Sequence, residues 1–169
     1  MKEYIDILEH SDEVARALRS TGVLLSAAKD GVVNSMTMGW AFIGRLWQVA
    51  YAVCLVRESR YTRKLIDSSG VFTISVPDSP AERKILGYCG SRSGRDTDKI
   101  KDLGLTEVEA DENGVPGFKE LPLTIECTVQ SRRLLSKEDL PEDMLEAFYG
   151  DGDLHYLYFG KILKAYYIR

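Results

Sequence analysis

Three short segments of this 169-residue chain concentrate hydroxyl, amide and cationic side chains of the kind that hold an organic anion. Around the last two, residues 57–101 contain ten Lys or Arg and six Asp or Glu, a net charge of +4; the remainder contains twelve and twenty, a net charge of −8. One basic segment in an acidic chain favours a small anionic ligand over broad contact with nucleic acid. The alternative is a solvated face of mixed charge. The segments are 34–40 (NSMTMGW), 56–62 (VRESRYT) and 90–99 (GSRSGRDTDK).

The second segment has the pattern of a phosphate site. Residues 61–67 are predicted to form a short helix that ends at Gly70. Residues 59–62 then lie at its N-terminus, where free backbone N–H groups and the helix dipole favour an anion. The alternative is that Ser59 or Thr62 only caps the helix. Three arginines lie within seven residues and can bind phosphate oxygens bidentately: Arg57, Arg60 and Arg63.

The first and third segments suit a planar ligand lying above a backbone. The strand predicted to end at Asn34–Thr37 has small hydroxyls and an amide that can hydrogen-bond the edge of a heteroaromatic ring; the alternative is a half-exposed strand facing water. The glycines of 90–96 allow the backbone to approach a ligand closely, although a flexible surface loop is the alternative. This loop is neither a dinucleotide fingerprint nor a P-loop.

Strand patterns dominate the elements that must position these segments. Asp30-Gly31 predicts a hairpin, and residues 40–56 are predicted to form two strands. Residues 72–76 and 123–130 have the alternation of strands, and in the second of these the inward residues are Leu123, Ile125, Cys127 and Val129. Gly160 predicts a bulge in the last strand, which begins at 154. About six strands with few long helices favour an antiparallel barrel with helical covers, as one domain over 1–169.

Five helical stretches are expected around the barrel. Residues 1–20 are predicted helical with Ser11 as N-cap, and Ser79 with Glu82 forms a capping box for a helix that runs to about Gly87. A loop then precedes a short helix over 97–103, and an acidic helix within 136–149 has Met144, Leu145 and Phe148 on one side. The fifth is the helix over 61–67 described above.

Several function classes are disfavoured. Cys54, Cys89 and Cys127 have no close partner in sequence, which favours reduced thiols in the cytoplasm. The N-terminus has no apolar signal region, and the run from 40 to 56 is short and contains Arg45 and Gln48, so no membrane segment is expected. Ligand clusters at metal spacing are absent from the sequence, and His155 is expected to be structural.

The order and spacing of NSMTMGW, Trp47, VRESRYT, SGRDTDK and the closing HYLYFGK strand resemble the flavin reductase-like, flavoredoxin-type family of FMN-binding split barrels. The resemblance runs from Gly22 to that last strand. It implies a mainly β, six-stranded antiparallel Greek-key split β-barrel, a homodimer with FMN near the interface, and electron transfer with NADH or NADPH. Relatives often have a proline after the Trp47 region, where this chain has Val49-Ala50.

Carried over by position, the resemblance implies a set of FMN-binding residues. The ring would lie against Asn34, Met36, Thr37 and Met38; the ribityl chain and phosphate would contact Arg57, Ser59, Arg60, Tyr61 and Thr62; and Ser93, Gly94 and Lys99 would close over the cofactor. Flavin carries its own redox chemistry, so no side-chain acid or base is required as a catalytic residue. Lys99 or Arg95 is expected to offset the negative charge that grows on the reduced ring.

Three functions remain open. The first is an FMN-dependent NAD(P)H oxidoreductase of flavin reductase type, in which the nicotinamide stacks transiently on the exposed ring because the chain has no dinucleotide fingerprint. The second is a non-enzymatic FMN carrier that receives electrons from a redox partner protein. The third is a cofactor-free split-barrel interaction module, against which the retained residues 59–62 weigh.

Overall fold

One open antiparallel sheet of eight strands forms the centre of the molecule, in a computed structural model that describes residues 1–79 and 82–169. The strand order is β3-β2-β6-β9-β10-β5-β4, and β1 pairs with β10. The main strands are β1 (Lys2–Tyr4), β2 (Val23–Lys29), β3 (Val32–Met38), β4 (Ala41–Leu46), β5 (Val49–Arg57), β6 (Val71–Val76), β9 (Leu123–Leu134) and β10 (His155–Ile168). A second, two-stranded sheet pairs β7 (Glu107–Val108) with β8 (Gly117–Phe118).

The predicted mainly β split barrel is confirmed, because the described sheet is antiparallel and does not close between β3 and β4. The main sheet has eight strands where about six were expected. One addition is the three-residue β1, which the sequence pattern placed in a helix.

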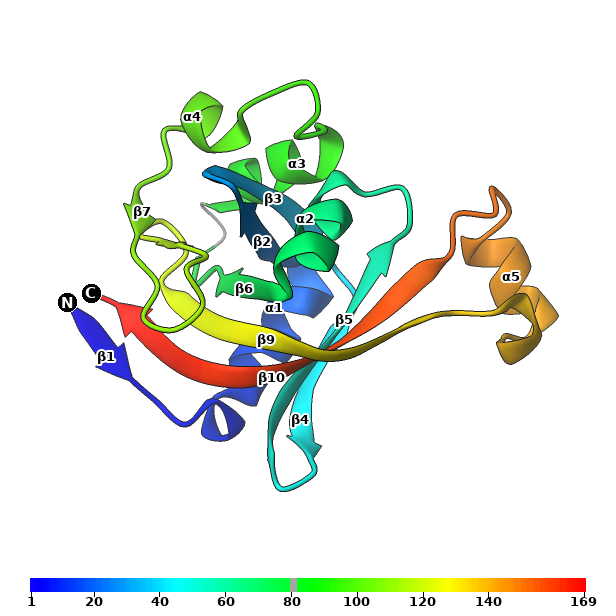
Figure 1. The fold of residues 1–169 in the computed structure, drawn as a ribbon, viewed down its shortest axis with the longest axis horizontal. Coiled ribbons are helices and arrows are strands. Elements are labelled where there is room, and N and C mark those ends of the chain that lie inside the picture. Colours follow the sequence, from blue (N-terminus) through cyan, green and yellow to red (C-terminus); the bar gives the residue numbers. More distant parts are fainter. Residues whose placement is uncertain (80–81) are drawn as a thin grey trace.

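Five α-helices lie around this sheet in the described residues (Figure 1). Helices α3 and α4 lie together over the β3 end of the molecule, and α5 sits at the tip of an arm formed by the ends of β9 and β10 (Figure 1). The helices are α1 (Ser11–Ser20), α2 (Tyr61–Ser69), α3 (Arg83–Ser91), α4 (Lys99–Leu103) and α5 (Glu142–Phe148), with 3-10 turns at Ile7–Glu9 and Lys137–Asp139.

The turn residues predicted from the sequence adopt left-handed backbone conformations. Asp30 and Gly31 have φ values of 51° and 78° and join β2 to β3, which confirms the predicted hairpin. Gly70 ends α2 in the left-handed conformation, as predicted.

Trp47 and Gln48 have positive φ values of 46° and 68° in the β4–β5 turn. That turn therefore places two non-glycine residues in an uncommon backbone region.

The predicted bulge at Gly160 is confirmed. The β9–β10 register shifts between Phe159 and Gly160, and a Cβ atom built on Gly160 would lie 2.3 Å from Cζ of the buried Phe72. Glycine at this position lets the bent strand pack directly against a core aromatic ring.

Two helix starts differ from the sequence prediction. Residues 1–20 are not one helix, because Lys2–Tyr4 pairs with β10. Ser11 is not the N-cap of α1; that position is His10, and the Ser11 hydroxyl donates to the Leu8 carbonyl. The short helix predicted over 97–103 begins only at Lys99, since the Asp98 carboxylate caps it by accepting from the Lys101 amide.

Helix α3 extends beyond the predicted end at Gly87 and continues through Gly90 to Ser91. Leu86 and Cys89 are buried against β2 and β3, and this packing overrides the low helix propensity of glycine. Of the predicted capping box, the Ser79 amide donates to Glu82 Oε2 at 3.0 Å; residues 80–81 between them lie outside the described residues.

The inward alternation predicted for 123–129 is confirmed for Leu123, Ile125 and Cys127, whereas Val129 is half-buried. Glu126 is buried as well, because its carboxylate accepts hydrogen bonds from the amides of residues 111–113 and from the Tyr166 hydroxyl. All three cysteines are buried and unpaired. Within residues 1–79 and 82–169, no helix is long and apolar enough to cross a membrane.

Candidate functional site

A cavity of about 360 Å³ opens where the start of α2, the middle of β3 and the loop between α3 and α4 meet. These elements bring together the three polar segments, which are separated by up to 65 positions in the sequence. The lining residues are Asn34, Met36, Arg57, Ser59, Arg60, Tyr61, Thr62, Ser91, Arg92, Ser93, Gly94, Arg95, Lys99 and Asp153.

Ten of the twelve predicted site residues line this cavity. The other two, Thr37 and Met38, line an adjoining cavity of about 150 Å³ that shares Met36, Arg57 and Arg60 with the first. The structure therefore places all twelve predicted residues around two neighbouring cavities. Their role in binding a cofactor stays a prediction.

The N-terminus of α2 faces the larger cavity without a side-chain cap. Arg60 is the N-cap residue, and its side chain accepts no hydrogen bond from the helix. The Tyr61 and Thr62 amides have no acceptor inside the helix and remain suited to an external anion, whereas the Arg63 amide donates to the Arg60 carbonyl at 3.2 Å. The interpretation of Ser59 or Thr62 as simple caps is wrong for this helix.

Two arginines contribute positive charge at the opening of this cavity. The Arg60 guanidinium donates to the Gly90 carbonyl at 3.2 Å, and Arg95 donates to the Ser59 carbonyl at 3.1 Å. The Arg95 guanidinium also lies 5.4 Å from the centre of the Tyr61 ring. These contacts join the last turn of α3 and the loop after it to the start of α2, and each guanidinium group keeps further N–H donors for a ligand.

The other two arginines of the predicted phosphate motif have different partners. Arg57 donates to the carbonyls of Asp153 and Phe148 at 2.7 and 2.9 Å and lies 3.6 Å from the Asp151 carboxylate, so it holds the turn before β10. Arg63 is not a lining residue and pairs with Asp67 at 2.6 Å. Fewer arginines are therefore free to bind a phosphate than the three predicted from the sequence.

Asp153 lines the cavity but lies outside all three polar segments predicted from the sequence. Its carboxylate accepts from the Ser59 amide at 3.0 Å and from the Ser59 hydroxyl at 2.6 Å. The sequence marks residues 151–153 only as a turn, and no local signal indicates that the turn folds back onto a helix start 94 residues earlier. Ser91 and Arg92 also line the cavity; they lie in the predicted segment 90–99 but were not among the residues carried over from the family.

Lys99 provides a buried positive charge at the base of the cavity. Its side chain is 4% exposed, and Nζ donates to the carbonyls of Ser35 and Cys89 at 2.8 and 3.0 Å. Burial lowers the pKa of this ammonium group, and the nearby Arg60 charge lowers it further. An ammonium group has three donors, so one N–H remains for a ligand.

Asn34, Thr62 and Gly94 form one packed unit in the wall of the cavity. Asn34 Nδ2 donates to Thr62 Oγ1 at 2.7 Å. A Cβ atom on Gly94 would lie 2.0 Å from Asn34 Oδ1 and 2.9 Å from Cδ1 of Tyr61. Glycine is required here so that the loop can lie against Asn34, a different reason from the ligand approach that the sequence suggested.

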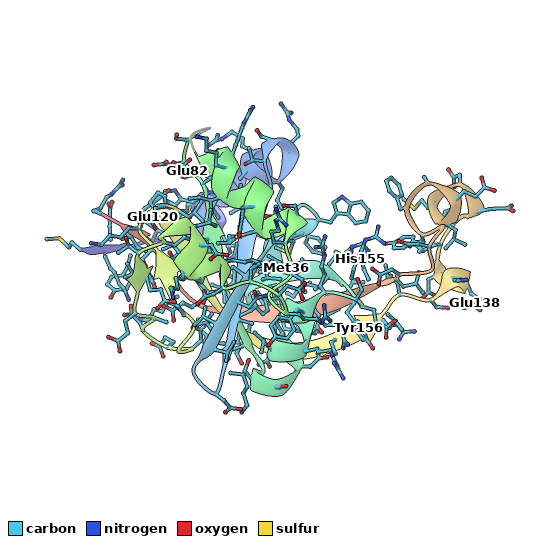
Figure 2. The ribbon with its side chains drawn as sticks, turned by 90° about the horizontal axis from the view of Figure 1, so that it is seen from above. Met36, Glu82, Glu120, Glu138, His155 and Tyr156 are labelled. Carbon is cyan, nitrogen blue, oxygen red and sulfur yellow. The ribbon has the colours of Figure 1, made fainter. Side chains whose placement is uncertain are left out.

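The smaller cavity is bordered by aromatic rings. His155 is 6% exposed, its Nδ1 lies 2.8 Å from the Tyr149 hydroxyl, and its ring centre is 4.9 Å from that of Trp40. Burial lowers the His155 pKa to about 4, and the Arg57 charge adds to the effect. Figure 2 shows His155 and Met36 close together at the centre of the molecule, in agreement with their shared cavity.

The residues of the larger cavity fit a phosphate-bearing aromatic cofactor. One end offers helix amides, hydroxyls and the Arg60 guanidinium, which suit a phosphate. The adjoining wall offers Asn34 and Met36 on β3, with Lys99 nearby, which suits a flat polar ring. Among the described lining residues, Asp153 alone has a carboxylate, whose negative charge opposes an anion.

Residues 15–169 match the family model described as the flavin reductase like domain, so the chain belongs to this family. A curated protein of Archaeoglobus fulgidus with no characterised function is 34% identical over 100 residues, which are 57% of this chain and 53% of that protein. The matching region is about half the length of the curated relatives it matches.

Solved structures share the fold. Flavoredoxin of Desulfovibrio vulgaris is 26% identical, with a TM-score of 0.68 over 88% of this chain and 70% of that one. The FMN-binding domain of a flavin reductases-like enzyme from Shewanella baltica is 21% identical, with a TM-score of 0.70 over 99% of this chain and 77% of that one. The family identified by resemblance is thereby confirmed.

Proposed function

We propose that this protein binds FMN in the larger cavity and moves electrons between NADH or NADPH and the flavin or a further acceptor. The observation that carries the proposal is the convergence of three distant polar segments on an uncapped helix start, beside the buried Lys99 ammonium group. Family membership and the flavoredoxin likeness support the same cofactor.

The residues divide the binding work between the two ends of the cofactor. The Tyr61 and Thr62 amides of α2 and the Arg60 guanidinium hold the phosphate, while Asn34 and Met36 on β3 orient the ring. When bound, FMN supplies the hydride and electron chemistry. Lys99 contributes a fixed positive charge that favours the more negative, reduced form of the ring.

A matched pair of variants on one helix tests the phosphate assignment. Arg60→Met removes the guanidinium at the cavity, and we expect FMN affinity to fall about tenfold or more, the usual effect of losing a charge-assisted hydrogen bond. Arg63→Met removes an equal charge three residues away that faces Asp67, and FMN affinity should change less than about threefold. Equal losses in the two variants would show that the helix start does not hold the phosphate.

Anaerobic mixing of the FMN-loaded protein with NADH or NADPH separates the two redox functions. Bleaching of the yellow protein on the timescale of turnover supports a reductase. A protein that stays yellow with both nicotinamides, yet is reduced by a protein donor, supports an electron carrier; the flavoredoxin likeness is the observation that favours this second function. A purified chain that takes up no FMN would contradict both and leave the cofactor-free module.

We also propose a homodimer and a reducing, cytoplasmic location. The β4–β5 hairpin presents Phe42 and Trp47 at 55% and 72% exposure, and Phe148 on α5 is 46% exposed. The hairpin and the arm that carries α5 both extend away from the body of the molecule (Figure 1), which gives a second copy two apolar surfaces to cover. Light scattering of the purified chain measures the oligomeric state, and cell fractionation tests the location.

A further inference from the structure

The turn before β10 places a carboxylate on donors at the start of α2. Asp153 Oδ1 accepts from the Ser59 amide at 3.0 Å, and Oδ2 accepts from the Ser59 hydroxyl at 2.6 Å. This carboxylate is negatively charged and accepts hydrogen bonds from N–H and O–H donors beside a helix N-terminus, as a phosphate would.

The backbone of this turn is held by contacts that do not use that carboxylate. The Arg57 guanidinium binds the carbonyls of Asp153 and Phe148, and the Glu58 amide donates to the Leu154 carbonyl at 2.9 Å. The Asp153 amide donates to Asp151 Oδ1 at 3.0 Å. The side chain of Asp153 can therefore turn away or lose its charge while the turn stays in place.

We propose that Asp153 is an internal anion that competes with the phosphate of a phosphorylated flavin and sets the affinity of the site for it. This inference rests on the proposed function. Either the phosphate takes the Ser59 donors and displaces the carboxylate, or it binds the Tyr61 and Thr62 amides with the carboxylate still close by. In both cases the negative charge of Asp153 weakens phosphate binding.

The consequence is that the site favours exchange of FMN over permanent retention. A phosphate carries about 1.5–2 negative charges near neutral pH, and like charges a few ångströms apart repel even near a wet protein surface. Removing the Asp153 charge should tighten FMN about tenfold. Riboflavin lacks the phosphate, so its affinity should not respond.

The experiment measures FMN and riboflavin dissociation constants by flavin fluorescence for the wild-type protein and two variants. Asp153→Asn keeps the shape of the side chain and an oxygen for the Ser59 amide but removes the charge. Asp151→Asn is the matched control, because it removes one charge from the same turn at a side chain that does not contact Ser59. We expect at least about fivefold tighter FMN binding in Asp153→Asn alone, with riboflavin unchanged within about twofold.

Three results would overturn the inference. FMN binding that weakens in Asp153→Asn would show that the carboxylate positions Ser59 for the phosphate. Equal tightening of riboflavin, or equal tightening in Asp151→Asn, would show a general effect of charge or of the turn. If the wild-type protein binds neither flavin, the proposed function fails together with the inference, a result distinct from flavin binding that ignores Asp153.

Discussion

Acid should destabilise this protein through His155 in a range where an ordinary surface histidine would not. The imidazole is 6% exposed between Tyr149 and Trp40, and its pKa falls from the usual 6.5 to about 4. Burial is the main cause, Arg57 and then Arg60 lower the value further, and Asp153 acts in the opposite direction. The native state therefore keeps this ring neutral over a range in which the unfolded chain protonates it.

The sign and size of the effect follow from proton linkage. Between pH 6.5 and about 4, the unfolded state binds the proton and the native state does not, so the free energy of unfolding falls as the pH falls. One pKa unit is worth about 1.4 kcal/mol, so the His155 contribution lost from pH 7 to pH 4 is about 3 kcal/mol. This is a large part of the 5–15 kcal/mol that stabilises a typical domain.

Urea unfolding of the wild-type protein and of His155→Asn across pH 4–7 measures this contribution. Asparagine retains a polar partner for the Tyr149 hydroxyl but does not titrate, so its pH profile should be flatter by about 3 kcal/mol over the range. Other carboxylates titrate equally in both proteins, and only the difference between the profiles is used. Parallel profiles would refute the assignment of a neutral, buried His155.

Two further pairs of variants test the fold and the site. Gly160→Ala should lower the free energy of unfolding by about 1–3 kcal/mol in urea melts, because its Cβ would overlap the Phe72 ring. The control Gly44→Ala has no heavy atom within 4 Å of the added Cβ and should change the free energy of unfolding by less than about 0.5 kcal/mol. Equal effects of the two substitutions would show that the bulge does not rest on Phe72. Lys99→Met should lower the midpoint potential of bound FMN by an amount on the order of 30 mV, measured by spectroelectrochemistry. Arg95→Met should lower it less, because Lys99 is buried and Arg95 is exposed. An unchanged potential in Lys99→Met would show that Lys99 does not act on the flavin ring.

Much of the fold and most of the site could be predicted because local chemistry marks them. Asp30-Gly31 and Gly70 need a left-handed backbone, and Gly160 stands out inside a strand pattern. The polar segments stand out because asparagine, serine and arginine interrupt apolar strands. Their order along the chain also resembles a family pattern. That resemblance predicts that the three segments share one site, which composition alone does not indicate.

The features that could not be predicted depend on contacts between distant residues. Helix α3 passes through two glycines because Leu86 and Cys89 bury against the sheet. Glu126 faces inward because a loop brings three amides to its carboxylate, and Asp153 reaches Ser59 across 94 positions. In each case, a residue type that is uncommon in its position, such as glycine inside a helix or a carboxylate in the core, is stabilised by a contact with a residue far away in the sequence.

A crystal structure of the protein soaked with FMN tests the central claim most directly. We expect the phosphate within hydrogen-bonding distance of the Tyr61 and Thr62 amides and of the Arg60 guanidinium, with the ring against β3 near Met36. An empty cavity at saturating FMN, or a phosphate bound away from the start of α2, would contradict the account.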